Sequence, residues 1–235
     1  MRALLQLYAY GGVHHATHAS IVKELLLRKA QHEIDHSMIC DDALISRSRS
    51  RGTAYFLASD ADVLFMVDHD IAWNPGDLWL TASHALEKNA LIAGLYSRRA
   101  FGQGTASRIA EEGVRFTVGG DKLHRADYLG TGFLAIPRTV LEGTIKACKK
   151  SWNKNMIVHP CGQDVSQDVA YYDLFRPIVV EDKMSKTGYS YLSEDWAWSA
   201  RARFAKFSLF IYEKPVLTHH GEHGFTVLDS VRKLS

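Results

Sequence analysis

The segment that most constrains the fold is residues 62–70, DVLFMVDHD, in which five successive apolar residues run directly into acidic ones. Such a run is typical of a strand buried on both faces, as in a parallel sheet with helices on each side. In open sheets of this kind, ligands bind just beyond the carboxyl ends of the strands. Asp68 and Asp70 therefore stand where a ligand site is expected.

The rest of the first hundred residues alternates between strand-like and helix-like patterns. Strands are expected at residues 3–9, 36–40 and 90–96, and helices at residues 16–30, 44–58 and from Pro75 to about 88. Proline is favourable in the first turn of a helix because its fixed φ fits there. The alternation predicts an α/β chain with a parallel, doubly wound sheet.

The second half of the chain has a different pattern. Strand-like pieces lie near residues 107–118, 124–136 and 177–180, followed by a helix at about 193–206 and a strand at 207–212. We expect this half to form a smaller, antiparallel part that completes a site begun by the first half. Because no linker or internal repeat separates the two, residues 1–235 are predicted to form one domain.

Composition excludes several classes of protein. The net charge is +2, so no strong field draws the chain to nucleic acid or anionic lipid, and no nucleic-acid partner is expected. No segment approaches the roughly 18 uninterrupted apolar residues that a bilayer crossing needs. Cys40, Cys148 and Cys161 are widely spaced and form no C-x-x-C pair. This pattern favours reduced thiols and a cytoplasmic location.

The spacing of Asp68 and Asp70 limits how they could share a cation. In extended chain, side chains two residues apart are separated by about 6.6 Å, whereas two oxygen ligands of one Mg²⁺-like ion lie only about 3–4 Å apart. Either the chain turns at His69, or one aspartate binds metal while the other holds a ribose or water. Carboxylates suit Mg²⁺ or Mn²⁺, which usually bring a diphosphate. The alternative is that both aspartates only cap the following turn.

Several segments, in order along the chain, resemble motifs of the nucleotide-sugar-dependent glycosyltransferases of the GT-A fold, particularly the single-domain inverting type. They are LISRSRSRGTAYFLAS with DVLFMVDHDIAWNPGDL, then ALIAGLYSRR, DYLGTGFLAIPRTVLE, YLSEDWAWSARAR and LTHHG, and they span residues 3–220. The resemblance implies a Rossmann-like domain with a mostly parallel central sheet flanked by helices and a smaller antiparallel acceptor-side part. About residues 1–100 would form its nucleotide-binding half and about 101–235 its acceptor-binding half.

The resemblance also implies a metal site and a catalytic base. Asp70 matches the aspartate that binds Mn²⁺ or Mg²⁺, and Asp68 the one that contacts ribose or metal. The late histidine of the metal site matches His219, with His220 left open because the spacing is ambiguous by one residue. Asp195 resembles the general base of inverting transfer, kept ionised by its place near a helix N-terminus.

Other positions are implied as substrate contacts. The donor-binding set is Tyr8, Ala9, Tyr10, Arg49, Asp68 and His69, and the acceptor-binding set is Thr131, Gly132 and Glu194. Within the donor set, Arg49 matches an arginine that points toward the donor phosphates. Simpler roles remain open for some of them: core packing for Tyr8, a tight turn at residues 130–132, and complementing a helix dipole for Glu194 and Asp195.

The sequence therefore predicts a metal-dependent glycosyltransferase. It would move a sugar from a UDP- or GDP-linked donor to a hydroxyl of a glycan or glycoconjugate acceptor, with inversion. One alternative is a nucleotidyltransferase, although the segment YAYGGVHHATH lacks the basic residues of a phosphate loop. Another is a non-catalytic module that binds a sugar or nucleotide.

Overall fold

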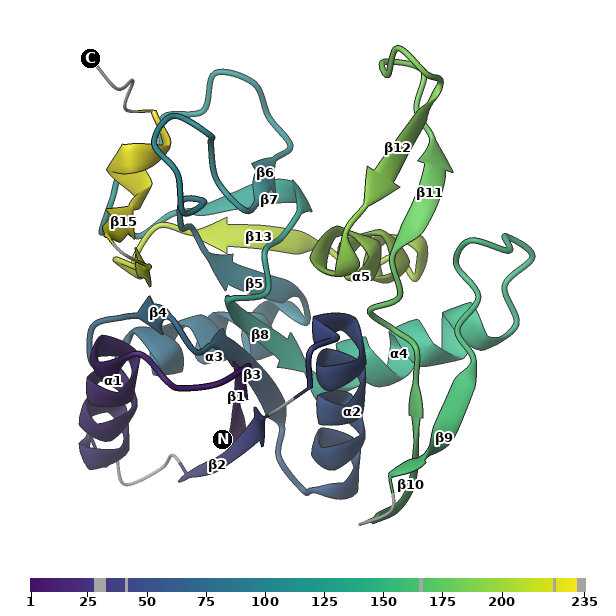
Figure 1. Ribbon diagram of the computed structural model, residues 1–235, viewed down its shortest axis with the longest axis horizontal. Helices are drawn as coiled ribbons and strands as arrows, with labels where there is room; N and C mark the ends of the chain where they lie inside the picture. Colours follow the sequence, from purple (N-terminus) through teal and green to yellow (C-terminus); the bar gives the residue numbers. More distant parts are fainter. Residues whose placement is uncertain (28–32, 41, 165–166, 222, 232–235) are drawn as a thin grey trace.

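An eight-stranded sheet forms the centre of the protein (Figure 1). The computed structural model describes residues 1–27, 33–40, 42–164, 167–221 and 223–231. The strand order in the sheet is β2-β1-β3-β8-β5-β13-β7-β6. In chain order these strands are β1 (Arg2–Ala9), β2 (Glu33–Cys40), β3 (Val63–Asp68), β5 (Leu91–Gly94), β6 (Arg108–Ile109), β7 (Leu123–Tyr128), β8 (Phe133–Pro137) and β13 (Leu209–Tyr212).

Most strands of this sheet run in one direction. β1 is parallel to β2 and β3, and β13 is parallel to β5. β8 is antiparallel to both β3 and β5, and β7 is antiparallel to both β13 and β6. Of the eight strands described, only β8 and β7 are thus reversed. The predicted α/β class and mostly parallel sheet are confirmed.

Antiparallel strands are present in the second half, as expected, but several of them belong to the main sheet instead of a smaller part. Residues 124–136 form parts of two strands, and β8 lies at the centre of the main sheet between β3 and β5. β13, β7 and β6 extend the same sheet. The strand expected at 107–118 is confined to Arg108–Ile109. Both halves of the chain therefore build one continuous core.

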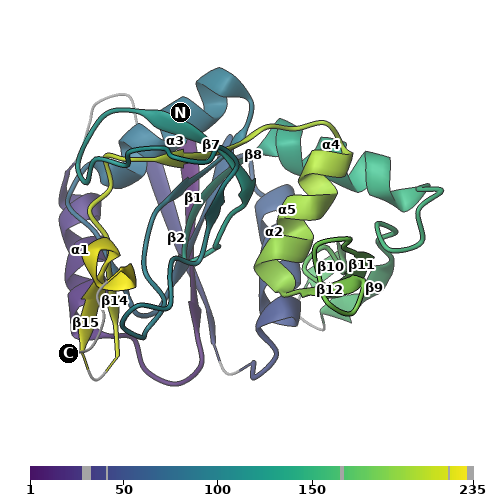
Figure 2. The same cartoon turned by 90° about the horizontal axis from the view of Figure 1, so that it is seen from above.

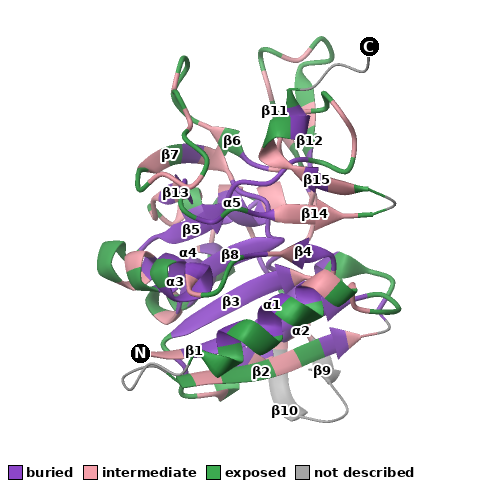
Figure 3. Cartoon of the chain, turned by 90° about the vertical axis from the view of Figure 1, so that its left-hand side faces the viewer, coloured by how far each residue is buried: buried purple, intermediate pink, exposed green. Residues whose placement is uncertain are grey.

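Helices cover both faces of the sheet (Figure 2). They are α1 (His15–Leu26) and α3 (Asp77–Lys88) on one face, and α2 (Ile45–Ala58), α4 (Arg138–Lys149) and α5 (Glu194–Phe204) on the other. β3 is buried on both faces, as predicted (Figure 3). Leu64 and Met66 belong to the core on the side of α2, α4 and α5, and Phe65 and Val67 to the core on the side of α1 and α3. The helix expected at 16–30 ends at Leu26, and residues 28–30 lie outside the described residues.

Smaller sheets surround this core. A three-stranded sheet combines β4 (Ile71–Ala72), β14 (Thr218–His220) and β15 (Gly224–Thr226), which is followed by a short 3₁₀ helix (Val227–Ser230). Two antiparallel pairs are β9 (Pro160–Asp164) with β10 (Gln167–Tyr172), and β11 (Ile178–Glu181) with β12 (Tyr189–Leu192). In the described part of the chain, no helix has the length and hydropathy needed to cross a bilayer. Cys40, Cys148 and Cys161 are unpaired thiols, as expected.

A glycine lets α2 pack closely against β1. Gln6 Nε2 donates a hydrogen bond to the carbonyl of Gly52 at 2.9 Å. A Cβ added at Gly52 would lie 2.2 Å from Tyr8 Oη and 2.5 Å from Gln6 Oε1, which is far inside van der Waals contact. This contact sets the distance between α2 and β1. It therefore also sets how far the other side chains of α2 extend toward the carboxyl end of β3.

We expect Gly52→Ala to destabilise the protein. In an unhindered helix the change would stabilise by about 1 kcal/mol, but here the clash with two buried side chains costs about 1–3 kcal/mol. Gly12→Ala is the control, since nothing lies within 4 Å of a Cβ at Gly12. Urea unfolding of both variants measures the difference. A Gly52→Ala protein as stable as the Gly12→Ala protein would contradict the close packing.

A buried acidic pair holds the chain that follows Asp70 against α1 and α3. Glu24 accepts hydrogen bonds from Trp73 Nε1 at 3.1 Å and from the Gly76 amide at 2.9 Å. Burial, assisted by the nearby carboxylate of Glu24, raises the pKa of Asp77 to about 6. The folded protein therefore binds a proton at Asp77 more tightly than the unfolded chain does.

Stability should consequently depend on the ionisation of Asp77. A folded-state pKa above the unfolded value stabilises the protonated form, so this contribution is complete below about pH 4 and is lost as the pH rises to about 6. The loss should amount to about 2–3 kcal/mol, and it should be absent in Asp77→Asn. Urea unfolding between pH 4 and 7 measures it. Parallel pH profiles for the two proteins would contradict the raised pKa.

Candidate functional site

Two adjoining cavities open beyond the carboxyl ends of β1, β3 and β5. The β1-side cavity, of about 320 Å³, is lined by Tyr8, Ala9, Tyr10, Asp42, Ala43, Ile45, Ser48, Arg49, Asp68, His69, Asp70, Arg99, Glu194 and His219. The α5-side cavity, of about 400 Å³, is lined by Asp68, Tyr96, Arg98, Arg99, Ala106, Tyr191, Ser193, Asp195, Trp196 and His219. Asp68, Arg99 and His219 line both, so they form a shared wall. Both volumes are typical of small-molecule sites.

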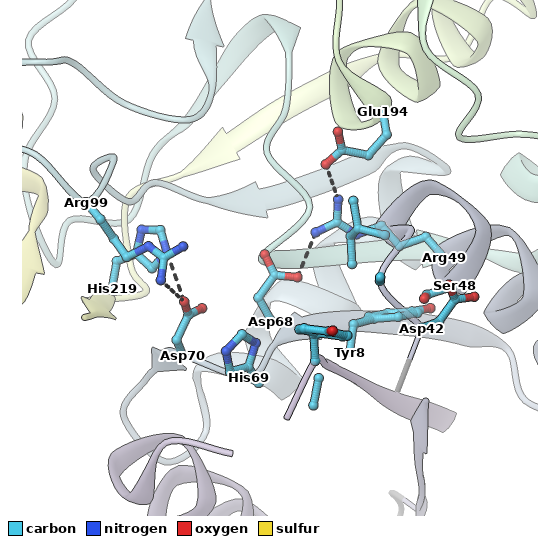
Figure 4. A pocket seen from close by; sticks show the side chains of 14 residues that line it. Tyr8, Asp42, Ser48, Arg49, Asp68, His69, Asp70, Arg99, Glu194 and His219 are labelled. Carbon is cyan, nitrogen blue, oxygen red and sulfur yellow. Dashed lines mark hydrogen bonds and ion pairs between the residues drawn. The ribbon is translucent and has the colours of Figure 1, made fainter. Parts of the chain in front are cut away.

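A buried arginine joins the elements that build this site (Figure 4). Arg49 of α2 donates through Nη2 to Asp68 Oδ1 at 2.7 Å and through Nη1 to Glu194 Oε1 at 2.6 Å. Its side chain is only 4% exposed, and those of Asp68 and Glu194 are 22% exposed. Burial works against the charge of Arg49, but the two carboxylates outweigh it and raise its pKa. Arg49 therefore connects the end of β3 to the start of α5.

These contacts give Arg49 a structural role beside the one expected of it. Both terminal nitrogens of its guanidinium bind carboxylates, so the side chain holds Asp68 and Glu194 in place. Arg49 and Glu194 both line the β1-side cavity, and neither lines the cavity that contains Asp195. Their expected donor and acceptor contacts stay predictions.

The chain turns after Asp68, and Asp70 faces His219 instead of Asp68 (Figure 4). β14 pairs antiparallel with β4, placing His219 beside Ile71, and the amide of His220 donates to the carbonyl of Asp70 at 2.7 Å. His219 Nε2 then lies 3.5 Å from Asp70 Oδ2. His220 points elsewhere, with its ring stacked on His14 at a centroid distance of 4.1 Å. The pairing register thus selects His219 over His220.

The chemistry of the Asp70–His219 pair fits a shared cation. His219 Nδ1 lies 2.9 Å from the carbonyl oxygen of Ser97, which can only accept, so Nδ1 carries the proton. In a neutral ring, Nε2 then directs a lone pair at a carboxylate oxygen 3.5 Å away. Two ligands of one divalent ion lie about 3–4 Å apart, and a carbonyl on the second ring nitrogen is the usual support for a metal-binding histidine.

Positive groups surround the same carboxylate. Burial opposes ionisation of Asp70, but His219, His69 and Arg99 outweigh it and hold its pKa below the usual value. Arg99 Nη1 lies 3.1 Å from Asp70 Oδ2, the same oxygen that faces His219. Within the described ranges, no group of three or more histidine, cysteine or acidic side chains could complete a metal site by itself. Further ligands would have to come from substrate and water, as is common for Mg²⁺.

Asp195 lies in the α5-side cavity at the N-terminus of α5. Its Oδ1 accepts hydrogen bonds from Ser193 Oγ and from the Trp196 amide, the latter at 2.8 Å. Burial raises the pKa of Asp195, and the hydrogen bond from Ser193 and the charge of Arg49 only partly offset it. Burial therefore has a larger effect on this pKa than the contacts at the helix N-terminus. A raised pKa makes the carboxylate a stronger base.

The end of β1 offers one accessible aromatic ring. Tyr8 is buried, and its hydroxyl donates to Gln6 Oε1 at 2.7 Å, so it forms a fixed wall of the β1-side cavity. Tyr10 is 69% exposed and its ring is open for stacking. Asp42 lines the same cavity, and its hydrogen bonds from Arg47, at 2.8 Å each, lower its pKa despite burial.

Thr131 and Gly132 lie behind the site and line neither cavity. The amide of Gly132 donates to Tyr96 Oη at 2.9 Å, and its carbonyl accepts from the Asp68 amide at 3.1 Å. A Cβ at Gly132 would lie 2.8 Å from Tyr96 Oη and 3.0 Å from Asp68 Oδ2. The segment therefore supports Asp68 and Tyr96 from behind the cavities, and the acceptor contacts expected of it stay a prediction.

Several lining residues were not predicted as site residues, among them the polar side chains of Asp42, Tyr96, Arg98 and Arg99. These four follow the carboxyl end of a strand, β2 for Asp42 and β5 for the other three. The same strand-end rule that selected Asp68 and Asp70 could have found them. What the sequence did not contain was the order of the strands, which brings these ends together.

Comparison with known proteins supports the fold. No protein-family model and no curated protein matches the chain. Among solved structures, the crystal structure of A197 from STIV matches with a TM-score of 0.57 and 14% identity, over 100% of this chain and 98% of that one. GalNAc-T7 with UDP, GalNAc and Mn²⁺ matches with a TM-score of 0.52 and 10% identity, over 92% of this chain and 43% of that one. At these identities the likeness shows a shared α/β fold and nothing finer.

Removing the Arg49 side chain should destabilise the protein. Arg49→Met leaves two partly buried carboxylates facing each other without a cation, which should cost about 3 kcal/mol. Arg203→Met is a suitable control because Arg203 is an exposed arginine with an ion pair to Asp127, worth less than about 1 kcal/mol. Urea unfolding at pH 7 measures both. An equal loss in the two variants would contradict a special role for Arg49.

Proposed function

We propose that this protein is a metal-dependent glycosyltransferase that transfers a sugar from a UDP- or GDP-linked donor to a hydroxyl of a glycan or glycoconjugate acceptor, with inversion. The observation that carries the proposal is the pair of cavities with a shared wall. One cavity leads to the end of β1 and to the Asp70–His219 pair, and the other contains Asp195. The folds of GalNAc-T7 and A197 support the same class of protein.

The β1-side cavity is assigned to the donor. Tyr10 offers a ring for stacking on the base, and Asp42 and Ser48 offer acceptors for base or ribose. Asp68, fixed by Arg49, is placed for the ribose, while Ala9 and His69 complete the wall. Asp70 and His219 would hold Mn²⁺ or Mg²⁺, which stabilises the departing diphosphate as a Lewis acid. Arg99, on the shared wall, adds positive charge beside the diphosphate.

The α5-side cavity is assigned to the acceptor. Asp195 Oδ1 is held by Ser193 and Trp196, so the carboxylate keeps one orientation in the cavity. It takes the proton of the acceptor hydroxyl as that oxygen forms a bond to the anomeric carbon and the bond from this carbon to the diphosphate breaks. Asp195 lies in one cavity and the diphosphate of the donor is assigned to the other, on the far side of the shared wall. This placement favours attack on the anomeric carbon from the face opposite the diphosphate, and hence inversion.

We assign both cavities to one domain that spans residues 1–235. About residues 1–100 supply most of the donor cavity, and the later residues supply Asp195 and its neighbours. The two halves are interlocked, because the donor cavity also uses His219 and Glu194.

Asp195→Asn should separate chemistry from binding. Because the amide accepts no proton, transfer should fall about 10²- to 10⁴-fold, while UDP or GDP still raises the melting temperature in Mn²⁺. Asp127→Asn on β7, outside both cavities, is the control. The assay follows nucleoside diphosphate release from UDP-, GDP- and TDP-sugars. Folded wild-type protein that neither turns over nor is stabilised by any donor would refute the proposal, and binding without turnover would indicate a non-catalytic module.

His219→Ala and His220→Ala form a matched pair for the metal site. His219→Ala should weaken Mn²⁺-dependent UDP binding by at least about tenfold, since even supporting partners of metal ligands are worth that much. His220→Ala should change it less, because this ring stacks on His14, whereas the ring of His219 is the one that forms the contact with Asp70 Oδ2. Calorimetry with and without chelator measures the binding. Equal losses in the two variants would argue against the Asp70–His219 site.

A further inference from the structure

Arg98 is an exposed cation that lines one of the two cavities. It lines the α5-side cavity and is absent from the walls of the β1-side cavity. Among the residues that the structure describes, none forms an ion pair or a side-chain hydrogen bond with its guanidinium; only its backbone is bonded, to Ser97 and Gly104. The other two arginines of the site are engaged, Arg49 with Asp68 and Glu194 and Arg99 with Asp70.

Aromatic side chains stand in the same cavity. Tyr191 is 69% exposed on β12, which leads directly into α5 (Figure 1). Trp196 is fixed, because its Nε1 donates to the carbonyl of Ala106 at 2.9 Å and its ring stacks on Tyr128 at a centroid distance of 4.5 Å. Rigid aromatic surface with a few placed polar groups is the usual lining of a small-molecule site. A sugar ring, apolar on its faces and polar at its edge, fits such a lining.

Arg98 has no evident structural task in this cavity. In the described part of the chain it forms no ion pair with Asp195, whose carboxylate accepts hydrogen bonds from Ser193 and Trp196 and is also influenced by the charge of Arg49. It is also separate from the donor side, where Arg99 and the Asp70–His219 pair already provide for the diphosphate. A neutral acceptor would need no cation here, whereas an anionic acceptor would need one to approach the carboxylate of Asp195.

We propose that the acceptor is a sugar that carries a negative charge, with a carboxylate or phosphate group bound by Arg98 while its ring packs on Tyr191 and Trp196. This inference rests on the function proposed above. The planar guanidinium suits both groups, because it can donate two parallel hydrogen bonds to either. The charged group stays intact in the reaction, and the hydroxyl that faces Asp195 is the one that reacts.

The test measures binding of three probes that differ in one group: methyl glucoside, methyl glucuronide and methyl glucoside 6-phosphate. Each is titrated by NMR into folded protein loaded with UDP and Mn²⁺. Wild-type protein should bind at least one anionic probe about 10- to 100-fold more tightly than methyl glucoside, the range expected for a charge-assisted pair. The anionic probe that binds more tightly shows whether Arg98 recognises a carboxylate or a phosphate.

Variants assign the preference to Arg98. Arg98→Gln should abolish the preference for the anionic probe, with methyl glucoside affected less than about twofold, and Arg98→Lys should keep part of it. Arg115→Gln is the control, because Arg115 is likewise exposed and lines neither cavity. Equal binding of neutral and anionic probes, or no binding of either anionic probe, would overturn the inference. So would a loss of UDP affinity in Arg98→Gln, which would assign Arg98 to the donor.

The two proposals fail in different ways. Wild-type protein that does not bind UDP in Mn²⁺ and does not hydrolyse any nucleotide sugar contradicts the glycosyltransferase function itself. Protein that binds and hydrolyses a donor but shows no preference for charged probes contradicts only the anionic acceptor.

Discussion

The site depends on one buried interaction, the guanidinium of Arg49 held between the carboxylates of Asp68 and Glu194. Removing a buried charge from its partner costs several kcal/mol, so the three side chains constrain each other's positions. They come from α2, the end of β3 and the start of α5, which are far apart in the sequence. Close packing of α2 at Gly52 brings Arg49 within hydrogen-bonding distance of both carboxylates. Because Arg49 fixes Glu194, it also constrains the position of the neighbouring Asp195.

A second constraint comes from a small sheet outside the main one. Pairing of β14 with β4 brings the C-terminal part of the chain to the turn after β3, and so places His219 against Asp70. The structural neighbours share the scaffold at 10–14% identity, and the chain corresponds to less than half of GalNAc-T7. A fold of this kind hosts many functions, so the activity depends on these side chains and cavities.

Local sequence patterns predicted much of the fold. The apolar run before Asp68 identified a strand buried on both faces, and Ser193 marked the start of α5. The pattern did not identify β8 as antiparallel, because a buried strand has the same composition whichever way its neighbours run. α4 was missed, although Val140, Leu141, Ile145 and Cys148 are buried along one face of it. Within residues 160–192 the strand expected near 177–180 is present as β11, but β9, β10 and β12 were missed, since short exposed strands carry little periodic signal.

The sequence by itself determined which elements form and which polar residues stand at their ends, because hydrophobic periodicity and capping act within a few residues. That was enough to select Asp68 and Asp70, whereas Asp195 was selected by its resemblance to a GT-A motif. Only the tertiary structure decided that His219 and not His220 meets Asp70, that Arg49 binds carboxylates, and that Thr131 and Gly132 lie behind the site. These contacts depend on strand order and on register between distant segments, where a shift of one residue turns every side chain to the opposite face.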